Sequence, residues 1–533
     1  STNVLSKSML IVLPGNVAGQ TRAERPRADW ERTDYVNLNG WWDFSFDPGQ
    51  EGQSKGWHQE DAVLEQKINV PFCWESSLSG VEDTDYLGQA WYQKKITPDA
   101  SWRGRKVFLK FGAVDWKCKL WVNGEEAGEH VGGYNAFEFD VTEHIKPGEE
   151  NTITLWVEDY GSYGDDSYPA LIGKQGRNAP CGYIHTSGIW QTVGMEARSA
   201  TYLDNAKAAA DVDNSSVTYT LDITSDAAQE LTVEYDFESK VYDMEQEKDV
   251  STGSVIKGSQ NIQAAEGKST VDLKAVTVQN PKLWNYNDPN LYYGTLTVKN
   301  AQGTVLDTVN TYFGMRKVEQ KYFDESLGVK YIYINNAPVY MSGLLDQGFW
   351  EDGIYTAPSE EALKYDILKM KEAGFNMIRK HLKVEDPLQY YWCDKLGMMV
   401  WQDMPHATAM VPDKAGDAAP GRQYYEECLD AMMNMNYNHP SIVAVMLFNE
   451  TWGLQKAYFD GKRDVVAADG KSTKTWVEEL FYRTKAINPN LLVEDMSPCN
   501  FDHVQPTELN TYHMYPSSYG ETVNMVERFV DNA

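Results

Sequence analysis

The first part of the chain is built from short runs in which apolar and polar residues alternate. Residues 107–141, VFLKFGAVDWKCKLWVNGEEAGEHVGGYNAFEFDV, contain three such runs, separated by Asn123-Gly124 and Gly132-Gly133. A period of two is typical of half-buried strands, and Asn-Gly between two such runs indicates a hairpin. The pattern predicts an antiparallel β-sandwich over residues 1–200.

A second set of alternating runs lies between residues 201 and 318. It includes VTYTLDIT, LTVEYDFES and LYYGTLTVKN, whose spacing predicts a small immunoglobulin-like sandwich. Because this segment has no cluster of chemically active residues, we expect it to act as a spacer.

From residue 319 to residue 533 the pattern changes to strands that alternate with helices. One helix is expected between Ser359 and Gly374, and another begins at Asp386-Pro387 and ends at Gly397. Strands that are apolar along most of their length and alternate with helices predict a parallel sheet covered on both faces. The expected strands are residues 338–343, 376–381, 398–403, 443–450, 491–496 and 508–513.

Each of the later strands carries its polar residues at its carboxyl end. A (β/α)8 barrel builds its site at that end. A doubly wound sheet also binds ligands there, but no Gly-rich phosphate loop follows these strands, so a TIM barrel is favoured. Because a barrel has eight strands, we expect the sequence to be truncated, with two strands after Ala533. The polar end residues are His381, Asp403, Glu450, Asp495 or Met496, and Tyr512 with His513.

The fourth of these strands, in VAVMLFNETWG, runs directly into Glu450. A buried, unpaired carboxylate is costly, so a fold keeps one only where it is paired, protonated or used. The dipeptide Asn449-Glu450 alone carries little information, since it occurs by chance in long chains. Its place at a strand end, where a barrel builds its site, makes Glu450 the leading candidate for a site residue.

Composition limits the kinds of partner. The 533 residues include 48 basic and 78 acidic side chains, a formal net charge of -30 at pH 7, which argues against nucleic acid and anionic membrane surfaces. The 17 Trp and 32 Tyr suit sugar rings as well as large β-rich cores. The longest apolar run near the start, MLIVLPG, is too short for a membrane span. The compartment is left open, with a periplasmic or secreted protein favoured over a cytoplasmic one and any signal peptide already absent.

The order sandwich, immunoglobulin-like domain and barrel resembles glycoside hydrolase family 2, the family of β-galactosidases, β-glucuronidases and β-mannosidases. LNGWWDFSFDPG, WVNGEEAGEHVGGYNAFEFDVT and SGIWQTV look like its amino-terminal jelly-roll domain of the sugar-binding type, and YFGMRKVE looks like the exit of its middle domain. GFNMIRKH, GMMVWQD, NHPSIVAVMLFNE and LNTYHMY look like consecutive barrel segments. The resemblance covers nearly the whole chain in the right order.

This resemblance implies a retaining exo-β-glycosidase that removes a terminal β-linked sugar. Such an enzyme uses an acid/base and a nucleophile whose carboxyl groups lie about 5 to 5.5 Å apart. Glu450 matches the general acid/base, and Asn449 matches the residue that binds the sugar 2-hydroxyl. We expect the surroundings of Glu450 to favour its protonated form. The family's nucleophile comes from the seventh strand and is therefore expected beyond Ala533.

Further positions match the family's substrate-binding wall. Arg379 matches an arginine that holds the nucleophile, Tyr512 matches a tyrosine that hydrogen-bonds it, and Asp403 matches an acid that contacts sugar hydroxyls. The remaining expected wall residues are His381, His513 and Tyr515.

Two departures from the family pattern leave the sugar open. His381 lies one position earlier than in the Arg-x-x-His pattern of family members, and QDMPHATA lacks the metal ligands of the large β-galactosidases. Galactose is the first expectation, with glucuronic acid or mannose as alternatives, and a non-catalytic carbohydrate-binding homologue is the other functional class. The mechanism requires no cofactor and no metal ligand is predicted. A structural divalent cation and a homo-oligomer are left open.

Overall fold

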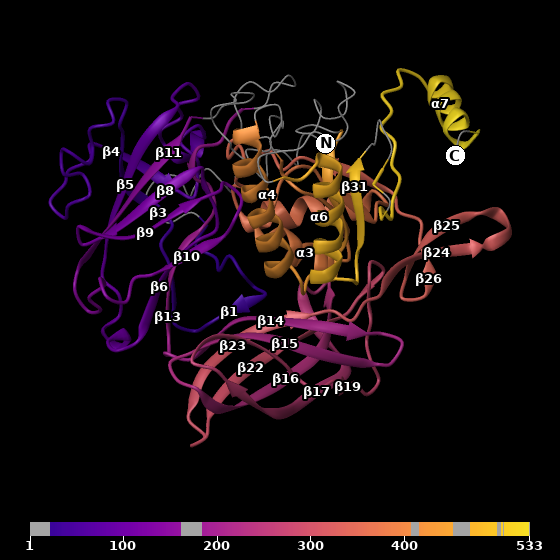
Figure 1. Cartoon of the computed structure of the whole chain (residues 1–533), viewed down its shortest axis with the longest axis horizontal. Helices are drawn as coiled ribbons and strands as arrows, with labels where there is room; N and C mark the ends of the chain where they lie inside the picture. Colours follow the sequence, from indigo (N-terminus) through magenta and orange to yellow (C-terminus); the bar gives the residue numbers. More distant parts are fainter. Residues whose placement is uncertain are drawn as a thin grey trace.

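The structure is a computed structural model that describes residues 22–160, 184–406, 415–450, 470–497, 503–504 and 506–531, with no side-chain description at 415–421 and 529. Three units follow one another along the chain (Figure 1). Cys73, Cys118, Cys393 and Cys428 are buried free thiols, whereas Cys181 and Cys499 lie outside the described residues. Among the described residues, no helix has both the length and the apolar content needed to cross a membrane.

The first unit is a sandwich of two main antiparallel sheets, as the alternating pattern predicts. The Asn-Gly hairpin is confirmed, with φ values of 52° at Asn123 and 81° at Gly124, the left-handed conformation that a tight hairpin turn requires. At Gly132-Gly133 the chain instead passes from one sheet to the other. One sheet has the order β4 (Gln66–Val70), β3 (Gly40–Phe46), β5 (Gly88–Ile96), β11 (Asn151–Asp159), β8 (Lys117–Val122), β9 (Glu125–Val131), and the other β10 (Phe137–Asp140), β6 (Lys106–Phe111), β13 (Val193–Arg198), β2 (Tyr35–Asn37).

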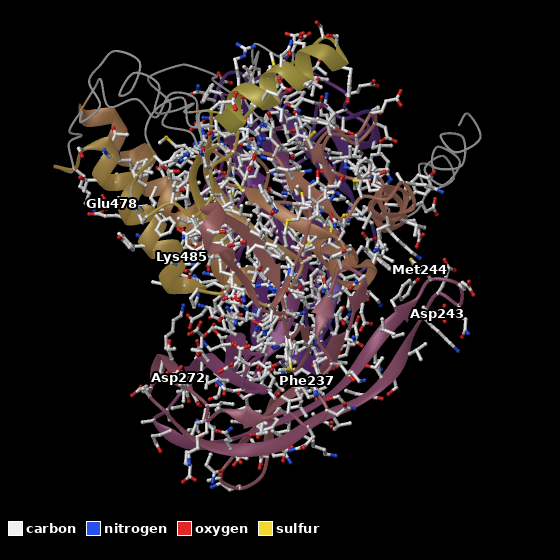
Figure 2. The ribbon with its side chains drawn as sticks, turned by 90° about the vertical axis from the view of Figure 1, so that its right-hand side faces the viewer. Phe237, Asp243, Met244, Asp272, Glu478 and Lys485 are labelled. Atoms are coloured by element: carbon white, nitrogen blue, oxygen red, sulfur yellow. The ribbon has the colours of Figure 1, made fainter. Side chains whose placement is uncertain are left out.

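The second unit is a smaller sandwich with an immunoglobulin-like arrangement of antiparallel strands. Its longest hairpin is curved, with Asp243 and Met244 near its tip and Phe237 in the body of the sandwich (Figure 2). One of its edge strands, β1 (Trp30–Glu31), comes from the segment before the first unit. Its sheets are β1, β23 (Val305–Phe313), β22 (Leu291–Asn300), β16 (Gln229–Asp243), β17 (Lys248–Ala264), and β14 (Tyr202–Asp211), β15 (Ser216–Ser225), β18 (Gly267–Asp272), with β19 (Val276–Thr277) beside β15.

The third unit has a five-stranded sheet in which every neighbouring pair is parallel. The strand order follows the chain order, which is the order of a (β/α) barrel, whereas a doubly wound sheet reverses direction part-way. The strands are β27 (Gly343–Asp346), β28 (Met377–Lys380), β29 (Met399–Asp403), β30 (Ile442–Asn449) and β31 (Leu492–Ser497).

Helices separate these strands, and the expected caps are present. The Ser359 hydroxyl accepts a hydrogen bond from the backbone N–H of Ala362, and the Asp386 carboxylate accepts one from Leu388, so each side chain satisfies an open donor of the first turn. On α6, Glu478 points away from the sheet (Figure 2), whereas Lys485 pairs with Glu508 beside the fifth parallel strand at 2.9 Å. The helices are α2 (Glu360–Glu372), α3 (Pro387–Leu396), α4 (Ala415–Met435), α6 (Thr473–Ile487) and α7 (Tyr519–Asp531).

Two of the six expected parallel strands are wrong. Residues 337–338 belong to a small antiparallel sheet formed by β24 (Val318–Asp324), β25 (Val329–Ile334) and β26 (Ala337–Pro338), and the parallel sheet begins only at Gly343. A Cβ at Gly343 would lie 1.9 Å from the Met377 carbonyl oxygen, so glycine permits the close approach that starts this pairing.

Residues 508–513 do not form a strand. Glu508 donates a backbone hydrogen bond to Val493 of β31. At Thr511, however, the backbone N–H donates to the Glu494 carboxylate at 3.1 Å and not to a backbone carbonyl. The segment therefore lies along β31 but is held partly by a side chain, and a regular ladder does not form.

Arg32 joins the first two units. Its guanidinium pairs with Asp307 of β23 through two hydrogen bonds of 2.9 Å and with Glu196 of β13 at 2.9 Å, and it also donates to the Leu203 carbonyl. Only 4% of the Arg32 side chain is exposed. A guanidinium buried to this extent is stable only with such partners, so both units depend on it for their relative position.

We predict that Arg32→Ala destabilises the chain by about 3–5 kcal/mol, because it leaves the buried Asp307 carboxylate without its guanidinium partner and removes one of the cations that pair with Glu196. Denaturant unfolding followed by tryptophan fluorescence measures the change. Lys257→Ala is the matched control, since Lys257 and Asp236 lie 3.7 Å apart with 72% and 60% of their side chains exposed, and such a pair is worth at most about 1 kcal/mol. Equal stability of the two variants would contradict the prediction.

Candidate active site

The structure places Glu450 directly after the last residue of β30. All eight residues of β30 are buried, and Asn449, its last residue, is 5% exposed. The backbone at Glu450 has a φ of 54°, a left-handed conformation that is uncommon for residues other than glycine and is concentrated at functional sites. Its N–H donates to the Ser497 carbonyl at the end of β31 at 2.6 Å. The apolar strand therefore presents Glu450 at the edge where the carboxyl ends of the strands meet.

Arg379 on β28 connects most of the predicted site residues. Its Nε lies 3.0 Å from both carboxylate oxygens of Asp403, its Nη2 donates to Asn449 Oδ1 at 2.9 Å, and its Nη1 lies 2.7 Å from His513 Nε2. The guanidinium thereby links β28, β29 and β30 with the segment after β31. Five donors in a rigid plane suit a side chain that must hold several acceptors at fixed positions.

Asp403 is an anion held by two neighbours. Burial alone would raise the pKa of its carboxyl group, but the charge of Arg379 and the hydrogen bond with His381 outweigh burial and lower it. His381 Nδ1 lies 2.5 Å from Asp403 Oδ2. Because the interior accepts this charge only while it is paired, Asp403 stabilises the positions of Arg379 and His381.

The hydrogen bonds around His513 determine which ring nitrogen carries the proton. A guanidinium can only donate, so His513 Nε2 accepts from Arg379, and the proton lies on Nδ1. The Nδ1–H then donates to Glu450 Oε1 at 2.8 Å. His513 thus points its Nδ1–H at the Glu450 carboxylate.

This arrangement corrects the expectation that the surroundings of Glu450 favour its protonated form. The hydrogen bond from His513 and a second one from the Tyr515 hydroxyl lower the pKa of Glu450 to about 2, against the smaller opposing effect of burial. A quarter of the Glu450 side chain is exposed, so water also solvates the carboxylate. A neighbour that donates hydrogen bonds to the charged form favours that form.

Of the other predicted residues, one contacts Glu450 and two make contacts outside the network. Tyr515 is 83% exposed, but its hydroxyl donates to Glu450 Oε1 at 3.1 Å. Tyr512 is 44% exposed, and its hydroxyl accepts from Asn510. Asp495, an alternative end residue of the fifth strand, points to His503 and to the backbone N–H of Val504. The structure therefore brings Arg379, His381, Asp403, Asn449, Glu450, His513 and Tyr515 into one network and places Tyr512 and Asp495 in other contacts.

Sequence reasoning missed two contributors to this network. His406 Nε2 accepts the backbone N–H of Asn449 at 3.1 Å, and the Ser497 hydroxyl lies 3.4 Å from His513 Nε2. His406 follows the third parallel strand by three residues, so its place after a strand end was an available signal. No comparable signal was available for Ser497, because the fifth strand was expected to end at Met496. Across the described ranges, no group of three or more His, Cys, Asp and Glu residues could hold a metal ion.

Comparison with known protein families agrees with this architecture. Family models match residues 35–196 (glycosyl hydrolases family 2, sugar binding domain), 201–316 (glycosyl hydrolases family 2) and 327–517 (glycosyl hydrolases family 2, TIM barrel domain). The chain belongs to glycosyl hydrolases family 2.

Several named relatives match most of this family 2 chain. A putative beta-glucuronidase of Formosa agariphila is 28% identical over 403 residues, which cover 73% of the chain and 43% of the relative. A beta-glucuronidase of Bacteroides fragilis is 24% identical over 93% of the chain and 66% of the relative. A beta-galactosidase of Priestia megaterium is 25% identical over 79% and 41%. The chain thus spans about two fifths to two thirds of the length of these relatives.

Solved structures share the fold. A Bacteroides uniformis beta-glucuronidase superimposes with a TM-score of 0.67 at 21% identity. The superposition covers 88% of this chain and 52% of the Bacteroides uniformis chain. A Ruminococcus gnavus β-glucuronidase in complex with D-glucuronic acid gives a TM-score of 0.64 at 18% identity, over 86% of this chain and 72% of its own. At these identities the likeness supports the fold, including the TIM-barrel domain.

We predict that His513→Ala raises the pKa of Glu450 from about 2 toward the ordinary glutamate value of about 4.3, because the alanine no longer donates to the carboxylate. Carbon-13 NMR of labelled glutamate side chains measures this titration, and the Glu450 signal is identified by its loss in Glu450→Gln. His144→Ala is the control, since it removes a histidine–glutamate contact of 2.9 Å in the first unit and leaves Glu450 unchanged. A Glu450 signal that already titrates near 4.3 in the parent chain would contradict the prediction.

Proposed function

We propose that the protein is a retaining exo-β-glycosidase in which Glu450 is the general acid/base. The observation that carries this proposal is the position of Glu450, which follows Asn449 at the carboxyl end of a fully buried parallel strand and lies within the network centred on Arg379. In a barrel, that end of the strands is where catalytic groups are placed. Membership of family 2 and the names of its relatives support the same reaction class.

In this mechanism Glu450 protonates the leaving oxygen in the first step and activates water in the second. The ionised state that His513 stabilises is the state required for the second step. Protonation for the first step requires a competing influence, and a second carboxylate about 5 to 5.5 Å away supplies one, because its negative charge raises the pKa of its neighbour. Asn449 is proposed to bind the sugar 2-hydroxyl.

The acids at the other described strand ends are each paired with a basic side chain. Asp403 pairs with Arg379 and His381, Asp495 binds His503, and Asp346 pairs with Lys380 at 3.0 Å. We therefore propose that the nucleophilic carboxylate comes from a segment of the protein other than these strand ends. Arg379 and Tyr512 are proposed to contact that carboxylate when it is present, and Asp403, His381, His513 and Tyr515 to line the sugar site.

For the sugar, β-glucuronidase activity is the better-supported proposal. Two of the relatives named above carry that name, one of them with the qualifier putative, whereas the Priestia megaterium relative is a beta-galactosidase. Galactose, the first expectation from the sequence, becomes the second candidate.

A panel of 4-nitrophenyl β-glycosides tests the proposal on the protein at its native length. We expect hydrolysis of the β-glucuronide to exceed that of the β-galactoside and β-mannoside. Glu450→Gln should lower kcat by roughly 10²- to 10⁴-fold, since this is the usual contribution of general acid/base catalysis. Glu478→Gln on the outer face of α6 is the control and should leave kcat unchanged.

Two results would overturn the proposal. Unchanged turnover in Glu450→Gln would remove Glu450 from the mechanism. Sugar binding by the native-length protein without hydrolysis of any substrate would instead support a carbohydrate-binding role.

A further inference from the structure

A cavity of about 350 Å³ lies where the three units meet. The four-stranded sheet of the first unit contributes Tyr35 and Lys110, the second unit contributes Asn205, and the barrel contributes Pro387 and Met435. None of the predicted active-site residues lines it. Its volume falls within the usual range for small-molecule sites, and junctions between domains are a common place for such sites.

Glycines in the sheet make room for the side chains that line this cavity. Lys110 pairs across the sheet with Gly194. A Cβ at Gly194 would lie 2.2 Å from the Tyr35 hydroxyl oxygen, and a Cβ at Gly112 would lie 2.7 Å from the Cβ of Gln191. The tyrosine and the glutamine can therefore occupy their positions at the cavity only because these two residues lack side chains.

Several polar groups at the cavity are left without protein partners. Gln191 is 7% exposed, and in the described part of the chain no partner is found for its side-chain amide. No side-chain hydrogen bond of Asn135 or Glu31 is found there either, although the charge of Arg25 lies near the Glu31 carboxyl group. Among the described residues, Lys110 makes one ion pair, with Glu196 at 3.4 Å. Because Glu31, Lys110 and Asn135 are only partly buried, water in the cavity can satisfy these groups, and a polar molecule that binds there can replace that water at the same donors and acceptors.

The charges at the cavity favour a neutral ligand. Arg27 pairs with Asp29 at 2.8 Å, Arg32 pairs with Asp307 and Glu196, and Arg198 pairs with Glu196. What remains for a ligand is the Lys110 ammonium group, two amides, and the oppositely charged Arg25 and Glu31, which lie near each other. This set provides donors and acceptors in balance, which suits hydroxyl groups. A phosphate or another anion would face the Glu31, Glu138 and Glu196 carboxylates that line the cavity, where Lys110 and Arg25 each already lie beside one of them.

We propose that this cavity is a second carbohydrate site, separate from Glu450, that binds a neutral mono- or disaccharide. Lys110, Gln191 and Asn135 would bind sugar hydroxyls. The ring of Tyr35 offers an aromatic face for the C–H groups of a sugar ring. Because this site requires no catalysis, it goes beyond the proposed glycosidase activity.

Calorimetric titration of the Glu450→Gln chain with lactose, cellobiose and inorganic phosphate tests the proposal, since this substitution prevents turnover in the proposed mechanism and leaves the cavity intact. We expect a disaccharide to bind at least tenfold more weakly after Gln191→Leu or Lys110→Met is added. Lys257→Met, on the exposed surface of the second unit, is the matched control and should leave binding unchanged. Crystals soaked in the same disaccharide should place it between Tyr35 and Gln191.

Three results would overturn the proposal: no binding of either disaccharide, binding that is equal in the parent chain and both cavity variants, or phosphate binding that depends on Lys110 and exceeds that of the sugars. Thermal unfolding of each variant checks that it is folded. If both cavity variants fail to fold, Asn135→Ala at the partly exposed edge of the cavity replaces them, with the same expected loss. The comparison of the parent chain with its cavity variants does not depend on the role of Glu450, so a failure of the glycosidase proposal would leave this result unaffected.

Discussion

The ion pair between Arg379 and Asp403 joins the second and third strands of the parallel sheet at the edge where the candidate site lies. Both side chains are largely buried, and an uncompensated charge there would cost several kcal/mol, on the order of 3–5. The two charges therefore stay paired, and the pairing fixes the plane of the Arg379 guanidinium. The remaining donors of Arg379 then determine where Asn449 and His513 lie, and His513 in turn determines the protonation state of Glu450.

A comparable constraint operates between the units. Arg32 lies in the linker between β1 and β2, and it neutralises carboxylates of both sandwiches. Because β1 also adds to the sheet of the second unit, the segment before the first sandwich holds the second one in place. The cavity at the junction is bounded by this same segment, so its shape depends on a charge network and not on apolar packing alone.

Much of the fold was readable from local patterns. The alternation of period two, the Asn123-Gly124 turn, and the caps at Ser359 and Asp386 depend on residues close in sequence, and the structure confirms them. The two wrong strands involve longer-range pairing. The parallel sheet begins at Gly343 because of its approach to Met377, and residues 508–513 are held by the Glu494 side chain, which no periodicity indicates.

The sequence by itself determined which residue types stand at the strand ends, their order along the chain and the family they resemble, because these depend on composition and short spacing. Only the tertiary structure decided that Glu450 is ionised, since its partner His513 lies 63 positions further along the chain. The junction cavity could not be predicted from the sequence either, because its walls come from all three units. Hydrogen-bond direction and burial depend on which distant segments meet, and a linear pattern does not carry that information.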